Sequence, residues 1–170
     1  MKMSDRFTVR SLTRAALIAA MYVLLTYFLQ AISFQGTQFR VSEALTLLPI
    51  LMAEAVPALG VGCFLANLLA GAVWYDVVFG ALATLAAAAL TRRLRKRVYL
   101  AALMPTLFNG LVVGPIVYFE FLHAPGTAVN VPLLLTNMGT VALGEAVVCY
   151  ALGVPMIFAL KKLGGGLLKD

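Results

Sequence analysis

Charged residues are scarce in this sequence. Asp, Glu, Lys and Arg make up 12% of its 170 residues, whereas a soluble globular domain contains about 25%. Hydrophobic residues make up 62%, and long apolar runs recur along the whole length. We therefore predict an all-α integral membrane protein in which residues 1–170 form a single membrane domain, without room for a second, soluble domain.

Residues that bind metals or form disulfides are also few. The single histidine, His123, argues against a histidine-ligated metal site. Cys63 and Cys149 fall inside apolar segments, as small core residues do, and form neither a disulfide framework nor a redox motif. The phosphate-binding motif G-x-x-x-x-G-K-[ST] and the catalytic motifs H-E-x-x-H and G-x-S-x-G are missing. We therefore expect no enzyme, no cofactor and no metal.

The apolar runs predict six helices, at about 12–31, 42–53, 56–71, 75–91, 98–119 and 130–160. If residues 44–73 formed one helix, it would measure about 45 Å, against a hydrocarbon core of about 30 Å. Pro57 disfavours helix at Val56 and Glu54 prefers water, so a break is placed there. The first run lacks a convincing signal-peptide cleavage site, so we expect it to be retained.

The basic residues indicate how many helices cross the membrane. If 44–73 crossed once, the run RRLRKR at 92–97 would lie outside, against the positive-inside rule. With two crossings, 12 of the 13 basic residues are cytoplasmic and Arg40 alone is outside. We therefore predict a bundle of six transmembrane helices in the cell membrane, with the N-terminus and C-terminus cytoplasmic. Topology and attraction to anionic membrane lipid then explain the basic clusters, and nucleic acid is not an expected partner.

The last segment, 130–160, is too long for a simple crossing. Pro132, Asn137 and Gly139 suggest that its first part lies outside as a cap or extended loop, and that the crossing begins near Thr140. The sequence leaves the conformation of the cap at 120–139 open.

Polar residues from four chain segments fall in the outer third of the predicted membrane, and we predict that they contact a ligand: Arg40, Glu43, Asn67, Asp76 and Glu145. Ionisable residues at this depth usually face a bundle interior or a water-filled cavity. Simpler explanations stay open. Glu43 and Asp76 could simply favour the positive ends of helix dipoles, and Asn67 could join helices. Arg40 could form only a local ion pair with Glu43, or a structural pair with Glu145.

Aromatic residues gather at the same end, where an interfacial belt would explain most of them. Trp74 and Tyr75, immediately before Asp76, are the two that we predict to contact the ligand. Carboxylates, an amide and aromatic faces together suit a flat, nitrogen-rich heterocycle. One carboxylate could accept two hydrogen bonds from a guanine-like edge, and a second could pair with an amine substituent.

The first predicted helix carries a face of small residues, formed by Ala15, Ala16, Ala19 and Ala20. Such a face lets another helix approach closely. It could serve a partner protein or packing inside the bundle.

Four stretches resemble the QueT-type queuosine-precursor transport family: FRVSEALTLLP, CFLANLLAG, YDVVFGALATL and GEAVVCYALGVP. The resemblance covers about residues 10–160. It implies the substrate-binding S component of an energy-coupling-factor transporter, which works with a transmembrane coupling subunit and two cytoplasmic ATPases. In such components an alanine face on the first helix contacts the coupling subunit, and Ala15/Ala19 and Ala16/Ala20 match it.

The ligand that the resemblance implies is a 7-deazaguanine, either the aminomethyl compound preQ1 or queuine, held below outer loops at about 32–41, 71–75 and 120–131. The sequence does not select between these ligands or identify the ATPases. A self-sufficient secondary transporter or channel for a small polar heterocycle is the alternative, although the inner half of the membrane offers it only Glu54 and Asn109.

Overall fold

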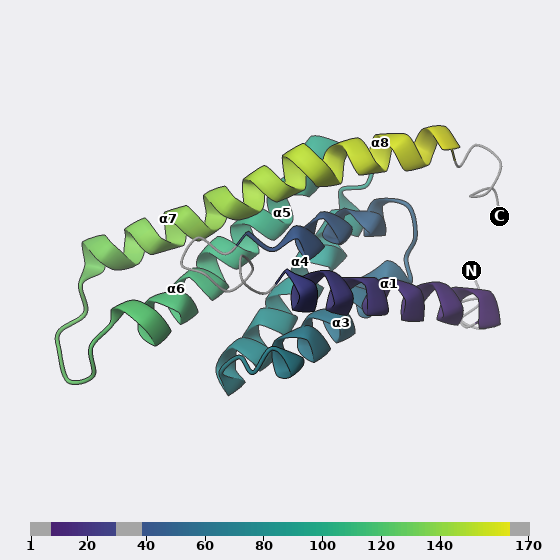
Figure 1. Ribbon diagram of the computed structural model, residues 1–170. Helices are drawn as coiled ribbons and strands as arrows, with labels where there is room; N and C mark the ends of the chain where they lie inside the picture. Colours follow the sequence, from purple (N-terminus) through teal and green to yellow (C-terminus); the bar gives the residue numbers. More distant parts are fainter. Residues whose placement is uncertain (1–7, 30–38, 164–170) are drawn as a thin grey trace.

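The computed structural model describes residues 8–29 and 39–163, and these residues form helices and connecting turns without a β-strand (Figure 1). The prediction of an all-α protein is therefore confirmed for this part of the chain. The helical elements, in order, are α1 (Val9–Phe28), η2 (Val41–Ile50), α3 (Ala55–Leu69), η3 (Asp76–Gly80), α4 (Ala81–Arg93), α5 (Val98–Phe108), η4 (Asn109–Val113), α6 (Gly114–Val117), η5 (Tyr118–Leu122), α7 (Val131–Val148), η6 (Cys149–Gly153) and α8 (Val154–Leu163).

Several of these elements join into longer helices. The π-helical turn η3 leads directly into α4, and α5 to η5 form one helix over 98–122. Likewise α7, η6 and α8 form one helix over 131–163. The described chain thus contains six helical segments, at positions close to the six that the sequence predicts.

Three segments in the described part are long and apolar enough to cross a membrane, namely Val9–Phe28, Val98–Leu122 and Val131–Leu163. The second segment differs from the α-helix expected at 42–53, because η2 is a 3-10 helix of 10 residues. Pro49 inside it has no backbone N–H and its ring crowds the preceding turn, which disfavours the α pattern. At about 2 Å per residue, η2 extends only about 20 Å. Six crossings therefore remain a prediction.

Of the two alternatives for the stretch before Thr140, a cap or an extended loop, the extended loop is wrong for 131–139, since residues 131–163 are helical throughout. Asn130 caps this helix by accepting a hydrogen bond from the backbone N–H of Leu133 at 3.1 Å. Its first half packs against α6: the Asn137 amide donates to the Gly114 carbonyl at 2.7 Å, and a Cβ on Gly114 would lie 2.8 Å from the Met138 Cα. Glycine permits this close approach, and the resulting hairpin extends beyond the other helices (Figure 1).

The remaining helices pack around one apolar core to which α1, η2, α3, α4, α5 and α8 all contribute. Leu47, Leu59 and Ile157 are fully buried there. In contrast, large apolar side chains are exposed along α1, α3 and α7, among them Leu17, Leu68 and Leu143. An apolar outer surface of this kind is typical of a protein that contacts lipid.

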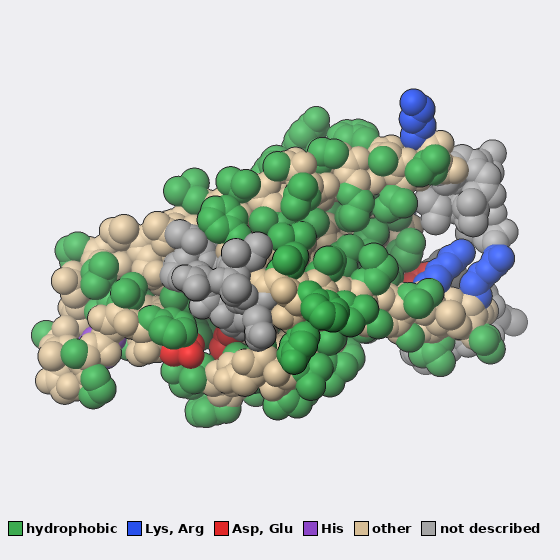
Figure 2. Space-filling view, in the orientation of Figure 1, with side chains coloured by type: hydrophobic (Ala, Val, Ile, Leu, Met, Phe, Trp, Pro, Cys, Tyr) green, Lys and Arg blue, Asp and Glu red, His purple; other side chains and the backbone are tan. Residues whose placement is uncertain are grey.

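The basic residues gather at one end of the molecule. The start of α1 and the end of α8 lie at this end (Figure 1), and Figure 2 shows Lys and Arg side chains there. Arg92 at the end of α4 donates to the carbonyls of Pro49 and Ile50, at 2.9 and 3.3 Å. These hydrogen bonds connect the end of α4 to the last turn of η2. Nearby, Arg14 pairs with Glu54 at 3.6 Å. The fold therefore places the basic clusters together, as the positive-inside argument requires.

Candidate ligand-binding site

Three of the predicted polar residues form one buried cluster. The guanidinium of Arg40 donates from Nη2 to Asp76 Oδ2 at 3.2 Å and from Nη1 to Asn67 Oδ1 at 3.3 Å. The Asn67 amide in turn donates to the Asp76 backbone carbonyl at 3.1 Å. All three residues are at most 2% exposed. Residues from η2, α3 and η3 are thus tied together by an ion pair and an amide.

Helix ends place these side chains. Arg40 immediately precedes η2, and Asp76 is the first residue of η3, where a carboxylate favours the positive end of the helix dipole. Gly80 follows one turn later, and a Cβ there would lie 2.8 Å from Asp76 Oδ1. Glycine at position 80 therefore makes room for the carboxylate.

Glu43 lies in the first turn of η2 and is 1% exposed. The Tyr22 hydroxyl of α1 donates to its Oε1 atom, while Oε2 has no hydrogen-bond partner. Beside this contact, the hydroxyls of Thr26 and Ser42 share a hydrogen bond of 2.7 Å. Glu43 is therefore fixed from one side and keeps one acceptor atom open.

Glu145 of α7 is the second buried carboxylate in this region, also 1% exposed. It interacts electrostatically with Glu43, and the Asn109 side chain lies beside both carboxylates. Its Oε2 atom has no hydrogen-bond partner. One turn later, the Cys149 thiol contacts the Glu43 backbone carbonyl at 3.8 Å, which joins the two elements.

Three π-helical turns surround these side chains. Asp76 begins η3, Asn109 begins η4, and Cys149 begins η6 just after Glu145. A π turn widens the helix locally, and such turns occur frequently at functional sites. The departure from regular α-helix therefore coincides with the buried polar residues.

The five polar residues singled out in the sequence are all buried, and they form two groups. Arg40, Asn67 and Asp76 are joined by side-chain contacts, whereas Glu43 and Glu145 interact electrostatically. A backbone hydrogen bond of 2.9 Å from the Glu43 N–H to the Arg40 carbonyl links the two groups. The alternative in which Arg40 pairs locally with Glu43 does not match the ion pair that is present, which joins Arg40 to Asp76. The two predicted aromatic contacts lie differently. Trp74 is 73% exposed and Tyr75 is half-buried, and their rings form an edge-to-face pair 5.7 Å apart. Their contact with a ligand stays a prediction.

Sequence reasoning missed three residues of this region. Tyr22 is fully buried against Glu43, and the four-residue spacing of Ile18, Tyr22 and Thr26 on the buried face of α1 could have indicated it. Asn109 is counted in the sequence only as a polar residue of the inner half of the membrane, although it neighbours both carboxylates. Glu120 in η5 is partly exposed and interacts electrostatically with Asp76 and Arg40.

The alanine face of the first helix divides into two. Ala15 and Ala19 are half-buried, and Ala19 packs on α3, because a Cβ on Gly62 would lie 3.2 Å from its Cα atom. Ala16 and Ala20 are exposed. Internal packing thus accounts for one pair and leaves the other on the surface.

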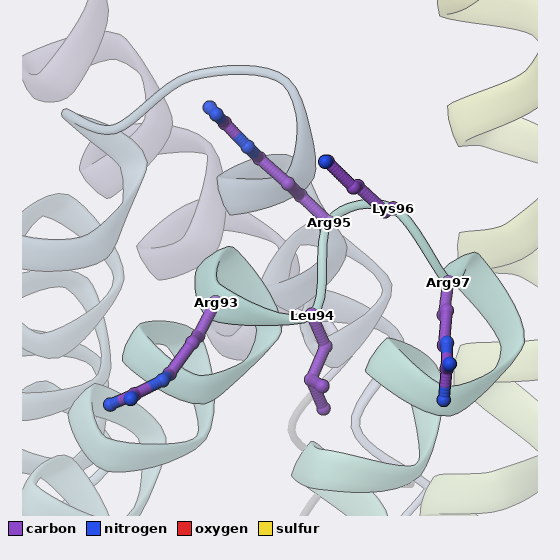
Figure 3. A pocket seen from close by; sticks show the side chains of 5 residues that line it. All are labelled: Arg93, Leu94, Arg95, Lys96 and Arg97. Carbon is purple, nitrogen blue, oxygen red and sulfur yellow. The ribbon is translucent and has the colours of Figure 1, made fainter.

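A hollow of about 400 Å³ lies at the basic turn between α4 and α5 (Figure 3), and none of the candidate ligand-binding residues lines it. It is lined by Arg93, Leu94, Arg95, Lys96 and Arg97. Their side chains point in different directions rather than toward one centre (Figure 3). Within 8–29 and 39–163, no group of three His, Cys, Asp or Glu residues could hold a metal ion.

Comparison with known proteins agrees with the resemblance noted in the sequence. The family model described as QueT transporter matches residues 12–162. A protein of Lactococcus lactis subsp. cremoris (strain MG1363) with the name queuosine precursor transporter QueT is 34% identical over 137 residues, which cover 76% of this chain and 80% of that relative. No solved structure matches.

Proposed function

Because this chain belongs to the QueT transporter family, we propose that it is the substrate-binding S component of an ATP-driven energy-coupling-factor importer. Its cargo is a queuosine precursor, a 7-deazaguanine such as preQ1 or queuine. It is a membrane transport protein and carries no catalytic function of its own.

The observation that carries the ligand class is the group of buried acceptor atoms without partners. Glu43 Oε2, Asp76 Oδ1 and Glu145 Oε2 are all buried and lack a hydrogen bond. Leaving such atoms unsatisfied costs about 1–3 kcal/mol each, and more for charged groups. A 7-deazaguanine presents several N–H donors, which would satisfy them. Water exclusion around a bound ligand would strengthen these contacts.

Transport needs partners, since the sequence has no ATPase motif. We assign the energy source to two cytoplasmic ATPases and the mechanical link to a transmembrane coupling subunit. The bundle lies in the cell membrane with six crossings and cytoplasmic termini, and the common location of its basic residues supports this topology.

The exposed pair Ala16 and Ala20 is the proposed contact with the coupling subunit. A bulky side chain there would prevent close helix approach without touching the buried cluster. Ala16→Trp and Ala20→Trp should therefore keep ligand affinity within about twofold and reduce uptake by more than about tenfold. Uptake would be measured in cells that also express the coupling subunit and ATPases, and affinity would be measured on the purified variants.

Leu17→Trp is the matched control, because Leu17 is 59% exposed on the same helix but off this stripe. Ala19 is a poor test position because it packs on Gly62. Loss of binding and uptake together in the Ala16 and Ala20 variants would contradict this division of roles.

The second candidate is a self-sufficient secondary transporter. Its weakness is the inner half of the membrane, because Asn109 lies beside Glu43 and Glu145 and leaves only Glu54 there. Uptake that requires added ATPase and coupling subunits separates the S component from this alternative.

The first experiment is equilibrium binding by the purified chain alone. Aminomethyl-7-deazaguanine, queuine and guanine are the test ligands, with riboflavin and thiamine as unrelated controls. Tight, saturable binding of one deazaguanine without partners is the expected result. Failure of all of them to bind would overturn the proposed cargo.

A further inference from the structure

The buried charges of the candidate site do not balance. Arg40 is the one basic residue in the described chain that is buried, and it forms its ion pair with Asp76. Glu43 and Glu145 are each 1% exposed, and among the described residues the one buried cation that acts on them electrostatically is this same Arg40. Residues 30–38, QAISFQGTQ, contain no basic residue. A single arginine among three buried carboxylates leaves an excess of negative charge, and burying such an excess is costly.

Each of the two carboxylates also has one buried oxygen atom without a hydrogen-bond partner. Glu43 receives the Tyr22 hydroxyl on Oε1, and both carboxylates neighbour the Asn109 side chain. Oε2 of each remains buried without a partner. These acceptors belong to η2 and α7, which contact each other, so a donor group with several N–H bonds between these elements would have an acceptor on each side.

We propose that Glu43 and Glu145 form a subsite for a protonated amine, so that this protein selects 7-deazaguanines with a cationic substituent over neutral ones of the same size. The inference rests on the proposed function and adds which part of the ligand each group of site residues binds. A protonated amine brings one positive charge and three N–H donors, whereas a hydroxyl in its place brings one donor and no charge. The heterocycle is then left to the Asp76 end of the site.

The cluster of Arg40, Asn67 and Asp76 fits that division of the ligand. Arg40 and Asn67 offer donors and Asp76 Oδ1 offers an acceptor, so the cluster carries the mixed polarity of a guanine-like edge. Charge there is already compensated by the ion pair. A cationic substituent therefore gains most at the Glu43–Glu145 end.

The test compares two ligands with equal numbers of heavy atoms, 7-aminomethyl-7-deazaguanine and 7-hydroxymethyl-7-deazaguanine. Binding to the full chain in detergent is measured by calorimetry at neutral pH. The amine should bind roughly tenfold to a hundredfold more tightly, the range expected for hydrogen bonds to a charged group. In Glu145→Gln, this ratio should fall to within about threefold, chiefly through weaker binding of the amine.

Glu54→Gln is the control, because Glu54 pairs with Arg14 at the basic end and lies outside the site. Its ratio should equal that of the unmodified chain. If both ligands bind the unmodified chain equally, the inference fails and the proposed function stands. If neither binds, both fail. The ratio in the unmodified chain decides the matter even if Glu145→Gln does not fold.

Discussion

The ion pair between Arg40 and Asp76 is the most completely described polar contact of the candidate site. Both side chains are 3% exposed, and the guanidinium also holds the Asn67 amide. A buried ion pair is not itself strong evidence of stability, since desolvation offsets much of the attraction. Removing one partner is different, because it leaves a charge buried alone.

Asp76→Asn should therefore destabilise the protein by about 3–5 kcal/mol, because Arg40 loses its carboxylate. Denaturant titration of the purified chain in detergent would measure the change in the free energy of unfolding.

Glu54→Gln breaks the Arg14 pair, in which the side chains are 36% and 20% exposed. This control should cost at most about 1 kcal/mol, since solvent screens such a pair. Equal losses in the two variants would show that the Arg40–Asp76 pair is not energetically special.

The sequence indicated Arg40, Glu43, Asp76 and Glu145 because a charge in an apolar chain is conspicuous on energetic grounds. Tyr22 and Asn109 were harder to find. Tyrosine is common at membrane interfaces and asparagine joins helices, so neither residue type points to one role. Tertiary contact with Glu43 distinguishes Tyr22, and this contact spans 21 positions of sequence.

At the scale of elements, hydrophobic runs predicted six helical segments, but they did not predict the type of helical turn within each segment. The 3-10 conformation of η2 and the π turns at Asp76, Asn109 and Cys149 depend on packing against other segments. Pro132, Asn137 and Gly139 left a cap or an extended loop open before Thr140. Asn130 caps a helix there and Pro132 sits in its first turn, where proline is tolerated.

The π turn η3 provides a prediction about Gly80. Gly80→Ala would bring a Cβ within 2.8 Å of Asp76 Oδ1 and 3.1 Å of Asn67 Nδ2. Asn67 Nδ2 is hydrogen-bonded to the Asp76 carbonyl, and Asp76 Oδ1 belongs to a carboxylate whose other oxygen binds Arg40, so neither atom can move freely. We expect a loss of about 1–3 kcal/mol of stability from overpacking, together with weaker ligand binding. Denaturant titration and calorimetry would measure the two effects.

Gly139→Ala is the control, since no atom lies within 4 Å of a Cβ built there. It should stabilise the protein by about 0.5–1 kcal/mol, because alanine favours helix over glycine. A Gly80→Ala variant with this same gain would contradict the close approach at Asp76.

At the scale of the whole molecule, the buried carboxylates of the candidate site and the basic residues lie toward opposite ends of the bundle. In η2, Glu43 lies near the first residue and the carbonyls that Arg92 binds lie near the last. The helix that begins at Trp74 has Asp76 at one end and Arg93 at the other. The basic residues therefore lie at one end of these helices and the carboxylates at the other. This arrangement fits uptake from the outer side toward the cytoplasm.

This polarity predicts the outcome of a labelling experiment. Single cysteines at Lys96→Cys, in the basic turn, and Ala128→Cys, in the turn between η5 and α7, would be introduced into a chain with Cys63 and Cys149 replaced by alanine. Both positions are exposed. A thiol reagent that cannot cross membranes should label position 128 in intact cells and position 96 only after permeabilisation, because the positive-inside rule keeps the basic turn cytoplasmic. Labelling in detergent controls for reactivity, and rapid labelling of position 96 in intact cells would exclude the six-crossing topology.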